Sequence, residues 1–209
     1  MKRTYLRENS LKFFHLYFYL FIYSITAGTI SAQYRISDFD AHKDYNAVIS
    51  LMQDEWLNLF PFPQFDAPLV NKMLLKNRPG DFMNAHKRLF IKVLHEEQTI
   101  AAFITYFFSD AHTIHIELLA TSKKFRGKGY GKKLIEYVIN SLSDKQYTSI
   151  ELYVYTTNSS AIGFYKHLGF TIKQAQAGGL ILGKEISPST KTVEATEYCL
   201  PNPLELALA

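Results

Sequence analysis

The chain has 209 residues, 47% of them hydrophobic, and it carries a formal net charge of +4 with one cysteine. That length is typical of one domain with extensions, and the apolar fraction is sufficient for a sizeable core. A lone cysteine, Cys199, excludes a disulfide framework and a cysteine-based metal cluster, and no metal site is expected.

Residues 1–32 differ in composition from the rest of the chain. Basic residues precede the aromatic and apolar run 13–23, and small residues follow it up to Ala32. This order is typical of a secretory signal cleaved after Ala32, while residues 13–32 together approach the roughly 20 residues that span a bilayer. A span would place the following domain on the far side of the membrane from the N-terminal cations. Export, a membrane anchor, and a translation start placed too far upstream are three open interpretations.

The domain itself is expected over residues 33–186. Apolar residues recur at helical spacing after Asp40, which is a good helix cap, and alternation or β-branched runs predict the strands. The expected elements are strands at 34–36, 88–94, 99–108, 114–120, 149–155 and 180–186, and helices at 45–56 and 69–76, with an aromatic, proline-broken stretch at 57–68.

A glycine-rich turn joins the strand 114–120 to a helix whose apolar stripe continues to Leu142. The turn reads Arg126-Gly127-Lys128-Gly129-Tyr130-Gly131. Glycines let the backbone approach a ligand closely, and a helix start offers unpaired N–H donors and the positive end of its dipole. The cations that surround the turn are Lys123, Lys124, Arg126, Lys128, Lys132 and Lys133. The turn is therefore predicted to bind phosphate.

The spacing of the glycines selects among phosphate-binding motifs. A Walker loop requires a hydroxyl residue after the lysine, and Gly131 is followed by Lys132-Lys133. The dinucleotide fingerprint is G-x-G-x-x-G, whereas the glycines here run G-x-G-x-G. The pattern that fits is R-x-x-G-x-G, from Arg126 to Gly131.

A second motif follows about thirty residues later. The stretch 158–170 has the pattern N-x-x-A-x-x-F-Y-x-x-x-G-F. Asn158 is a good N-cap, and Ala161, Tyr165 and their apolar neighbours line one helical face. Gly169 is suited to the left-handed stop at the end of that helix.

Together the two motifs resemble the acetyl-CoA-binding motifs of the GNAT superfamily of N-acetyltransferases. The resemblance covers about Tyr34 to Ile186. It implies an α/β (α+β) fold with a central mixed, mostly antiparallel, twisted sheet flanked by helices. Two central strands, ending at Ala120 and Tyr155, are expected to separate where acetyl-CoA enters, and acetyl-CoA is implied as cosubstrate. The cofactor-binding residues implied are Leu119, Ala120, Thr121, Arg126, Gly127, Lys128, Gly129, Tyr130, Gly131, Lys132, Asn158, Ala161 and Tyr165.

The resemblance also implies catalytic roles. Tyr165 matches the tyrosine that protonates the CoA thiolate, and a phenol with a pKa of about 10 is a suitable donor to a thiolate. Backbone N–H groups of residues 119–121 would bond the pantetheine arm and help to polarise the thioester carbonyl.

The base that accepts the amine proton is less well defined. Glu117 and His115 lie on one face of their strand by period-two alternation, so either could reach an amine directly or through water. Glu117 is the first candidate and His115 the second, with Glu151 and Tyr155 on the next strand as further candidates.

The acceptor side is expected to involve aromatic residues. In the superfamily the region of the first two helices lines the acceptor site, which implies that Trp56, Phe60 and Phe62 face the substrate, together with Tyr155. Ordinary core or lid packing is the competing interpretation for the first three.

The implied activity is transfer of an acetyl group from acetyl-CoA to a primary amine, directly and with both substrates bound together. Small-molecule and protein acceptors both fit, and the sequence identifies neither the acceptor nor the oligomeric state. The alternative is a catalytically silent acyl-CoA-binding or sensing module of the same fold. Nucleic acid is not expected as a partner, because the cations cluster on one turn and do not extend along an aromatic-interleaved face.

Two expectations concern the ends of the chain. The domain is expected in the cytoplasm, where acetyl-CoA is available, and this conflicts with the signal-like N-terminus and with membrane association through residues 13–32. Residues 187–209 are expected to form a flexible tail.

Overall fold

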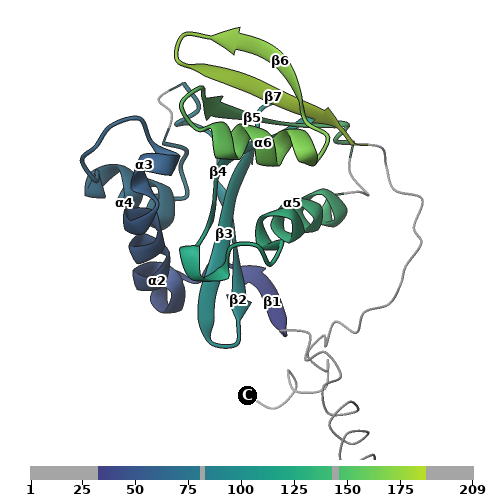
Figure 1. Ribbon diagram of the computed structural model, residues 1–209. Helices are drawn as coiled ribbons and strands as arrows, with labels where there is room; N and C mark the ends of the chain where they lie inside the picture. The colour runs from purple at the N-terminus through teal and green to yellow at the C-terminus, as the bar shows by residue number, and fades with distance from the viewer. Residues whose placement is uncertain (1–32, 81–82, 143–145, 187–209) are drawn as a thin grey trace, which may run out of the picture.

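The computed structural model describes residues 33–80, 83–142 and 146–186 (Figure 1). The signal-like segment 1–32 and the tail 187–209 lie outside the described residues. Within the described ranges, no helix has the length and apolar character needed to cross a membrane.

A seven-stranded sheet with the order β1-β2-β3-β4-β5-β7-β6 forms the centre of the domain. β4 and β5 pair in parallel, whereas the other five neighbouring pairs of described strands are antiparallel. The mixed, mostly antiparallel sheet expected from the sequence is therefore confirmed. The strands are β1 (Tyr34–Asp38), β2 (Phe90–Glu96), β3 (Thr99–Phe108), β4 (Thr113–Thr121), β5 (Ser149–Tyr155), β6 (Thr171–Gln176) and β7 (Gly179–Glu185).

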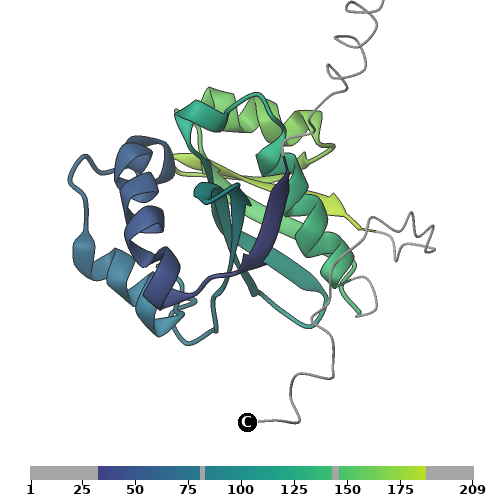
Figure 2. The ribbon, with the colours of Figure 1, turned by 90° about the horizontal axis from the view of Figure 1, so that it is seen from below.

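Helices cover both faces of this sheet (Figure 2). The helices are α2 (Ala41–Asp54), α3 (Trp56–Leu59), α4 (Ala67–Lys76), the 3-10 helix η1 (Lys123–Phe125), α5 (Tyr130–Ser141) and α6 (Ser159–His167). α4 begins two residues before the expected start at residue 69, because the Asp66 carboxylate caps it by accepting from the backbone N–H of Leu69 at 2.9 Å, and Pro68 fits the first turn. The helix expected at 45–56 is two helices, since the chain bends at Glu55.

Two hydrophobic cores lie on opposite faces of the sheet. α2 and α4 pack on one face, where Val48 and Met52 are fully buried beside Phe103. α5 and α6 cover the other face, which includes Ile104 and Leu152. The alternation of Phe103 and Ile104 between the two cores is that of a strand buried on both sides.

At a β-bulge in β4, the buried side chains switch from one face of the sheet to the other. Leu118 pairs with Thr105 of β3, but Ile116 pairs with the next residue, so Glu117 is the extra residue in β4. As a result Ile116 belongs to the core under α5, whereas Leu118 belongs to the core under α2 and α4. The Thr105 hydroxyl accepts from the backbone N–H of Leu118 at 3.0 Å and stabilises the bulge.

The two parallel strands separate beyond this bulge. β4 pairs with β5 from Thr113–Ser149 to Ile116–Leu152 and no further among the described strands. β4 nevertheless remains paired with β3 as far as Thr121, and β5 remains paired with β7 through Tyr155. The expected separation of the two central strands is confirmed, and it leaves the β5-facing edge of residues 117–121 without a strand partner.

Candidate functional site

The glycine turn follows the open end of β4, after the short 3-10 helix η1. Gly127 and Gly129 have φ values of 81° and 76°, the left-handed region that favours glycine. A Cβ added at either position would contact nothing within 4 Å, so the space beside the turn is open. The first intrahelical backbone bond of α5 is from the N–H of Lys133 to the carbonyl of Gly129 at 3.0 Å. The N–H groups of residues 130–132 precede it and are available to an anion.

The third glycine serves close packing. A Cβ on Gly131 would lie 3.1 Å from a ring carbon of Phe164 and 3.7 Å from a methyl group of Leu119. The start of α5 therefore lies against α6 and β4, and the two sequence motifs meet at this contact.

Several of the predicted cations have partners within the chain. Lys128 Nζ lies 2.6 Å from a carboxylate oxygen of Glu96 on β2, and the Tyr130 hydroxyl donates to the same carboxylate. These two donors, Lys128 first, lower the pKa of Glu96. Burial, followed by the bond to Glu96, raises the pKa of Tyr130 to about 12. Lys132 lies 3.7 Å from Glu136 on the next turn of α5. The Lys132–Glu136 pair is exposed and contributes little, so a phosphate can replace the partner of Lys132.

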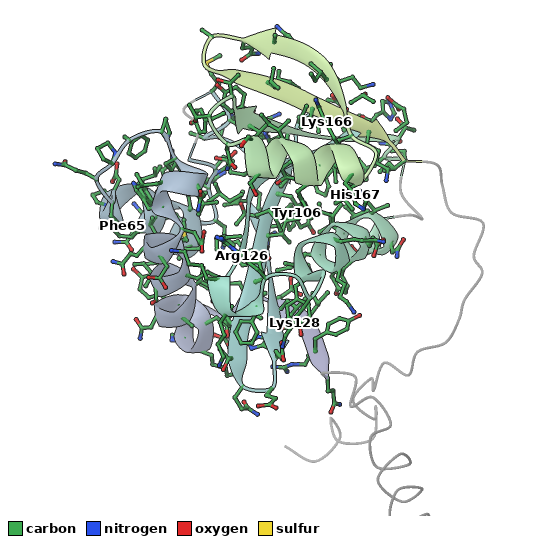
Figure 3. All side chains as sticks on the ribbon, viewed as in Figure 1. Phe65, Tyr106, Arg126, Lys128, Lys166 and His167 are labelled. Atoms are coloured by element: carbon green, nitrogen blue, oxygen red, sulfur yellow. The ribbon has the colours of Figure 1, made fainter. Side chains whose placement is uncertain are left out.

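Arg126 is tied to the opposite helical layer. Its guanidinium pairs with the carboxylate of Glu55 at the junction of α2 and α3, and its Nε donates to the carbonyl of Thr121 at 3.5 Å. Arg126 and Lys128 both lie on the loop between η1 and α5 (Figure 3). No sequence pattern marks Glu55 or Glu96, because an acidic residue at the end of a helix or strand is common at protein surfaces.

The second motif forms α6 as expected. The Asn158 side chain accepts from the backbone N–H of Ala161 at 3.0 Å, which is the predicted N-cap. Gly169 has a φ of 86° and ends the helix region. Both local predictions are confirmed.

Tyr165 lies inside the core beneath α6. Its ring centroid is 5.1 Å from that of Phe164 and 5.5 Å from that of Phe170, and the residue is 8% exposed. Burial raises the pKa of Tyr165 far above the ordinary value for a phenol. The hydroxyl therefore stays protonated and is suited to donate a hydrogen bond to a thiolate.

The candidate bases lie on the α2/α4 side of the sheet. The His115 ring stacks on Phe107 with centroids 4.8 Å apart, and its Nδ1 lies 3.3 Å from Glu151 on β5. This contact with His115 lowers the pKa of Glu151. Glu117 accepts from the backbone N–H of Gly80, after α4, at 2.9 Å. The structure thus places His115 and Glu117 on one face, although the bulge begins at Glu117.

The aromatic residues proposed for the acceptor side form one cluster. Trp56 is 4% exposed, and its indole N–H donates to the carbonyl of Phe62 at 2.9 Å. Its ring lies 4.2 Å from that of Phe60 between centroids. Phe62 is 37% exposed and borders a shallow hollow of about 540 Å³ that residues 62–66 and 68 line. Trp56 is thus a core residue that supports the loop, and Phe62 presents part of its ring at the surface.

Tyr155 is at the end of β5 on the side of Glu117. Burial is the main cause that raises its pKa, and the charge of Glu117 adds to it. Tyr155 therefore lies within electrostatic reach of the first candidate base. Among the described residues, no group of three or more His, Cys, Asp or Glu could hold a metal ion.

Solved structures of acetyltransferases share this architecture. The PaiA N-acetyltransferase of Thermoplasma acidophilum, crystallised with coenzyme A, is 15% identical, with a TM-score of 0.58 over 74% of this chain and 99% of that one. The ribosomal-protein-S18-alanine N-acetyltransferase of Escherichia coli is 20% identical, with a TM-score of 0.56 over 77% and 99%. At sequence identities of 15% and 20%, this structural similarity establishes the fold alone.

The sequence comparisons identify the family. An uncharacterized N-acetyltransferase of Methanocaldococcus jannaschii is 40% identical over 62 residues, which are 30% of this chain and 27% of that protein. The chain therefore matches only about a quarter of that relative's length. Residues 45–170 match the model of the acetyltransferase (GNAT) family. This match spans more than half of the sequence, and the chain belongs to the acetyltransferase (GNAT) family.

Proposed function

We propose that the protein is an N-acetyltransferase that moves the acetyl group of acetyl-CoA to a primary amine, directly and with both substrates bound. The observation that carries the proposal is the opening between β4 and β5, which has the glycine turn after one strand and α6 after the other. The acceptor is a small-molecule or protein amine. We place its action where acetyl-CoA is available, in the cytoplasm.

The cofactor would be held mainly by the backbone. The N–H groups of residues 127–132 would bind the pyrophosphate, because both left-handed glycines leave the space beside the turn open. The unpaired edge of β4 at residues 119–121 would bond the pantetheine arm and help to polarise the thioester carbonyl. Asn158 and Ala161 would contribute at the start of α6.

The chemistry requires two proton movements. The amine nitrogen attacks the thioester carbon, the carbon–sulfur bond breaks, and the sulfur takes a proton donated by the Tyr165 hydroxyl. Glu117 accepts the proton that the amine loses, and the N–H of Gly80 orients its carboxylate. His115, paired with Glu151, is the second candidate for this base, acting through water. Holding both reactants together supplies much of the rate enhancement.

A silent acyl-CoA-binding module of the same fold is the second candidate. It is favoured by the burial of Tyr165, because a phenol whose pKa lies far above that of a thiol (about 8.5) is a weak acid toward it. Release of free CoA thiol in the presence of an amine panel distinguishes the two, since only the enzyme produces it.

The first test is calorimetric titration of acetyl-CoA into the full chain and into Gly129→Glu. The glutamate places bulk and negative charge beside the turn, so binding is expected in the wild type and not in this variant. Gly178→Glu is the matched control, because Gly178 also has a left-handed φ, 81°, and lies in the turn between β6 and β7. Absence of binding by a folded wild-type chain would refute both candidate functions.

A further inference from the structure

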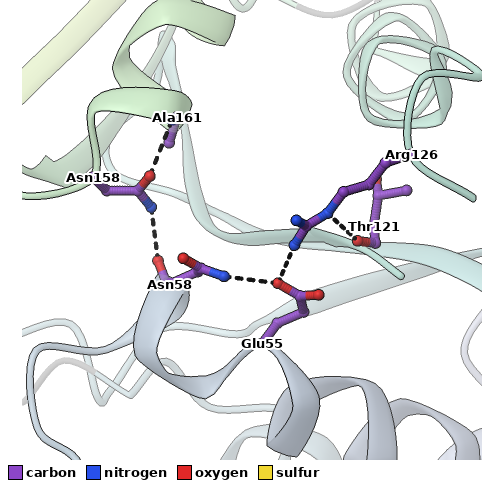
Figure 4. Close-up of polar contacts among 6 residues, drawn as sticks. All are labelled: Glu55, Asn58, Thr121, Arg126, Asn158 and Ala161. Atoms are coloured by element: carbon purple, nitrogen blue, oxygen red, sulfur yellow. Dashed lines mark hydrogen bonds and ion pairs between the residues drawn. The ribbon is translucent and has the colours of Figure 1, made fainter. Parts of the chain in front are cut away.

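The corner between α2 and α3, residues 55–58, connects the two acetyl-CoA motifs (Figure 4). The Glu55 carboxylate pairs with Arg126 at the start of the glycine turn, and the Asn58 side chain donates to the same carboxylate oxygen at 2.8 Å. The Asn158 side chain, at the start of α6, donates to the carbonyl of Asn58 at 2.9 Å. These contacts join Glu55 to Arg126, which is 71 positions away in the sequence, and Asn58 to Asn158, which is 100 positions away.

This chain of contacts connects the two sides of the opening. Arg126 follows β4 and Asn158 follows β5, and these strands no longer pair beyond Ile116 and Leu152. The α2–α3 corner is therefore a second connection between the two motifs, beside the packing of Gly131 against Phe164. Arg126 and Glu55 form the contact between the glycine turn and this corner.

Glu55 makes this connection stiff. The residue is 3% exposed, and its Oε1 is buried with no hydrogen-bond partner among the described residues. A buried carboxylate that loses its cation is strongly destabilising. Glu55 and Arg126 are therefore held together, whereas the Arg126 side chain is 52% exposed and open to a ligand.

The residue after Glu55 is the centre of the aromatic cluster. Trp56 contacts the rings of Phe60, Phe62 and Phe65, and its N–H bonds the backbone of the loop that borders the surface hollow. Because Trp56 adjoins Glu55 in the chain, a movement of the backbone at Glu55 moves the indole as well.

We propose that Glu55 is a positioning residue that couples acetyl-CoA binding at the glycine turn to the aromatic cluster of Trp56, Phe60, Phe62 and Phe65. The inference rests on the proposed function. A pyrophosphate on the turn attracts the Arg126 guanidinium, which draws the paired Glu55 carboxylate with it and moves the α2–α3 corner. The cluster reaches its acceptor-binding arrangement when the cofactor is bound. The coupling requires that the cofactor favour one position of the corner over the other.

The single tryptophan of the chain makes this coupling measurable. The full chain is titrated with acetyl-CoA while heat and the emission of Trp56 are recorded. The wild type is expected to show an emission change that saturates with binding. In Glu55→Gln the dissociation constant is expected to rise roughly tenfold, because Arg126 loses the charged partner that positions it at the turn. The emission change at saturation should fall to less than half.

A double-mutant cycle tests whether Glu55 acts through Arg126. Arg126→Gln is expected to weaken binding to a similar degree, and the double variant should bind no more than about twofold more weakly than either single variant. Independent roles would give about a hundredfold loss in the double variant and would overturn the proposal.

Two further variants complete the test. Glu185→Gln removes the same charge from an exposed pair with Lys173 and should keep the wild-type affinity and emission change. Asn58→Ala alters a surface side chain and removes one donor to Glu55, so it reports the coupling if Glu55→Gln does not fold. Wild-type affinity and emission change in Glu55→Gln, or in Asn58→Ala if that variant alone folds, overturn the inference and leave the proposed function standing. No binding by the wild type overturns both.

Discussion

Tyr165, the proposed proton donor, has the surroundings of a core residue. Its raised pKa means that the hydroxyl is neutral over the whole physiological range, so its ionisation does not limit the rate there. Tyr165→Phe keeps the ring contacts with Phe164 and Phe170 and removes the donor. We expect kcat to fall about 10²-fold, the scale of general acid catalysis, while the dissociation constant of acetyl-CoA changes less than about twofold.

The measurement is thiol release with an amine that the wild type accepts, beside calorimetry with acetyl-CoA. Tyr147→Phe is the control, since Tyr147 stacks on Phe108 away from both motifs. An unchanged kcat in Tyr165→Phe would remove the proton-donor role and leave Tyr165 as a packing residue.

Residues whose roles are local could be predicted from the sequence. Asn158 is the cap that its spacing indicates, and Gly129 has the left-handed backbone that the turn requires. Glu55 and Glu96 could not be predicted, because their partners lie 71 and 34 or 32 residues away and no local pattern records such pairing. For the same reason Lys128 appeared free in the sequence and is paired in the fold.

At the level of elements, α6 is specified by its cap. Asn158 performs two tasks with two atoms, since its Oδ1 caps the helix and its Nδ2 reaches Asn58. Asn158→Ala removes both contacts, whereas Asn158→Ser keeps an oxygen that can accept from the N–H of Ala161. We expect the alanine variant to lose about 1 kcal/mol of unfolding free energy and the serine variant to retain most of it.

Urea unfolding of the two variants checks this expectation. Equal losses would mean that the contact to Asn58, and not the cap, holds the start of α6. The difference in unfolding free energy between Asn158→Ser and the wild type measures the contribution of the contact to the α2–α3 corner by itself.

The elements also show where periodicity fails. The alternation of β4 looks uninterrupted in the sequence, yet the bulge at Glu117 moves Leu118 to the other core. A bulge depends on the register of two strands, so one strand's pattern cannot reveal it. The start of α4 could have been predicted from the sequence, because Asp66 and Pro68 are common signals of a helix N-terminus.

The whole molecule is built so that both faces of one sheet are covered, which buries polar side chains as well as apolar ones. The mostly antiparallel sheet and the separation of its two central strands followed from the family resemblance, since local pattern does not determine which strands pair. The contacts that the α2–α3 corner makes with Arg126 and Asn158, beyond the paired part of β4 and β5, could be seen only in the tertiary structure. The least predictable part of the domain is therefore the part that surrounds the candidate site.

Burial of tyrosines limits the stability of the whole domain at alkaline pH. Burial is the first cause that raises the pKa of Tyr106 and Tyr130 to about 12, and Tyr165 is raised further. Unfolded tyrosines ionise near pH 10, so between pH 10 and about 12 the unfolded chain releases protons that the folded chain retains. The stability that these groups contribute is complete below pH 10 and is lost as the pH rises, so the Tm should fall steeply over this interval.

Thermal melts of the full chain between pH 8 and about 12, followed by circular dichroism, check the slope. Tyr106→Phe keeps the stacked contact with Phe90 and removes one buried phenol, so its Tm should fall less steeply than that of the wild type. Tyr153→Phe, outside both cores, controls for the loss of a tyrosine as such. If the slopes of wild type and Tyr106→Phe coincide, ionisation of buried tyrosine is not what limits the fold at high pH.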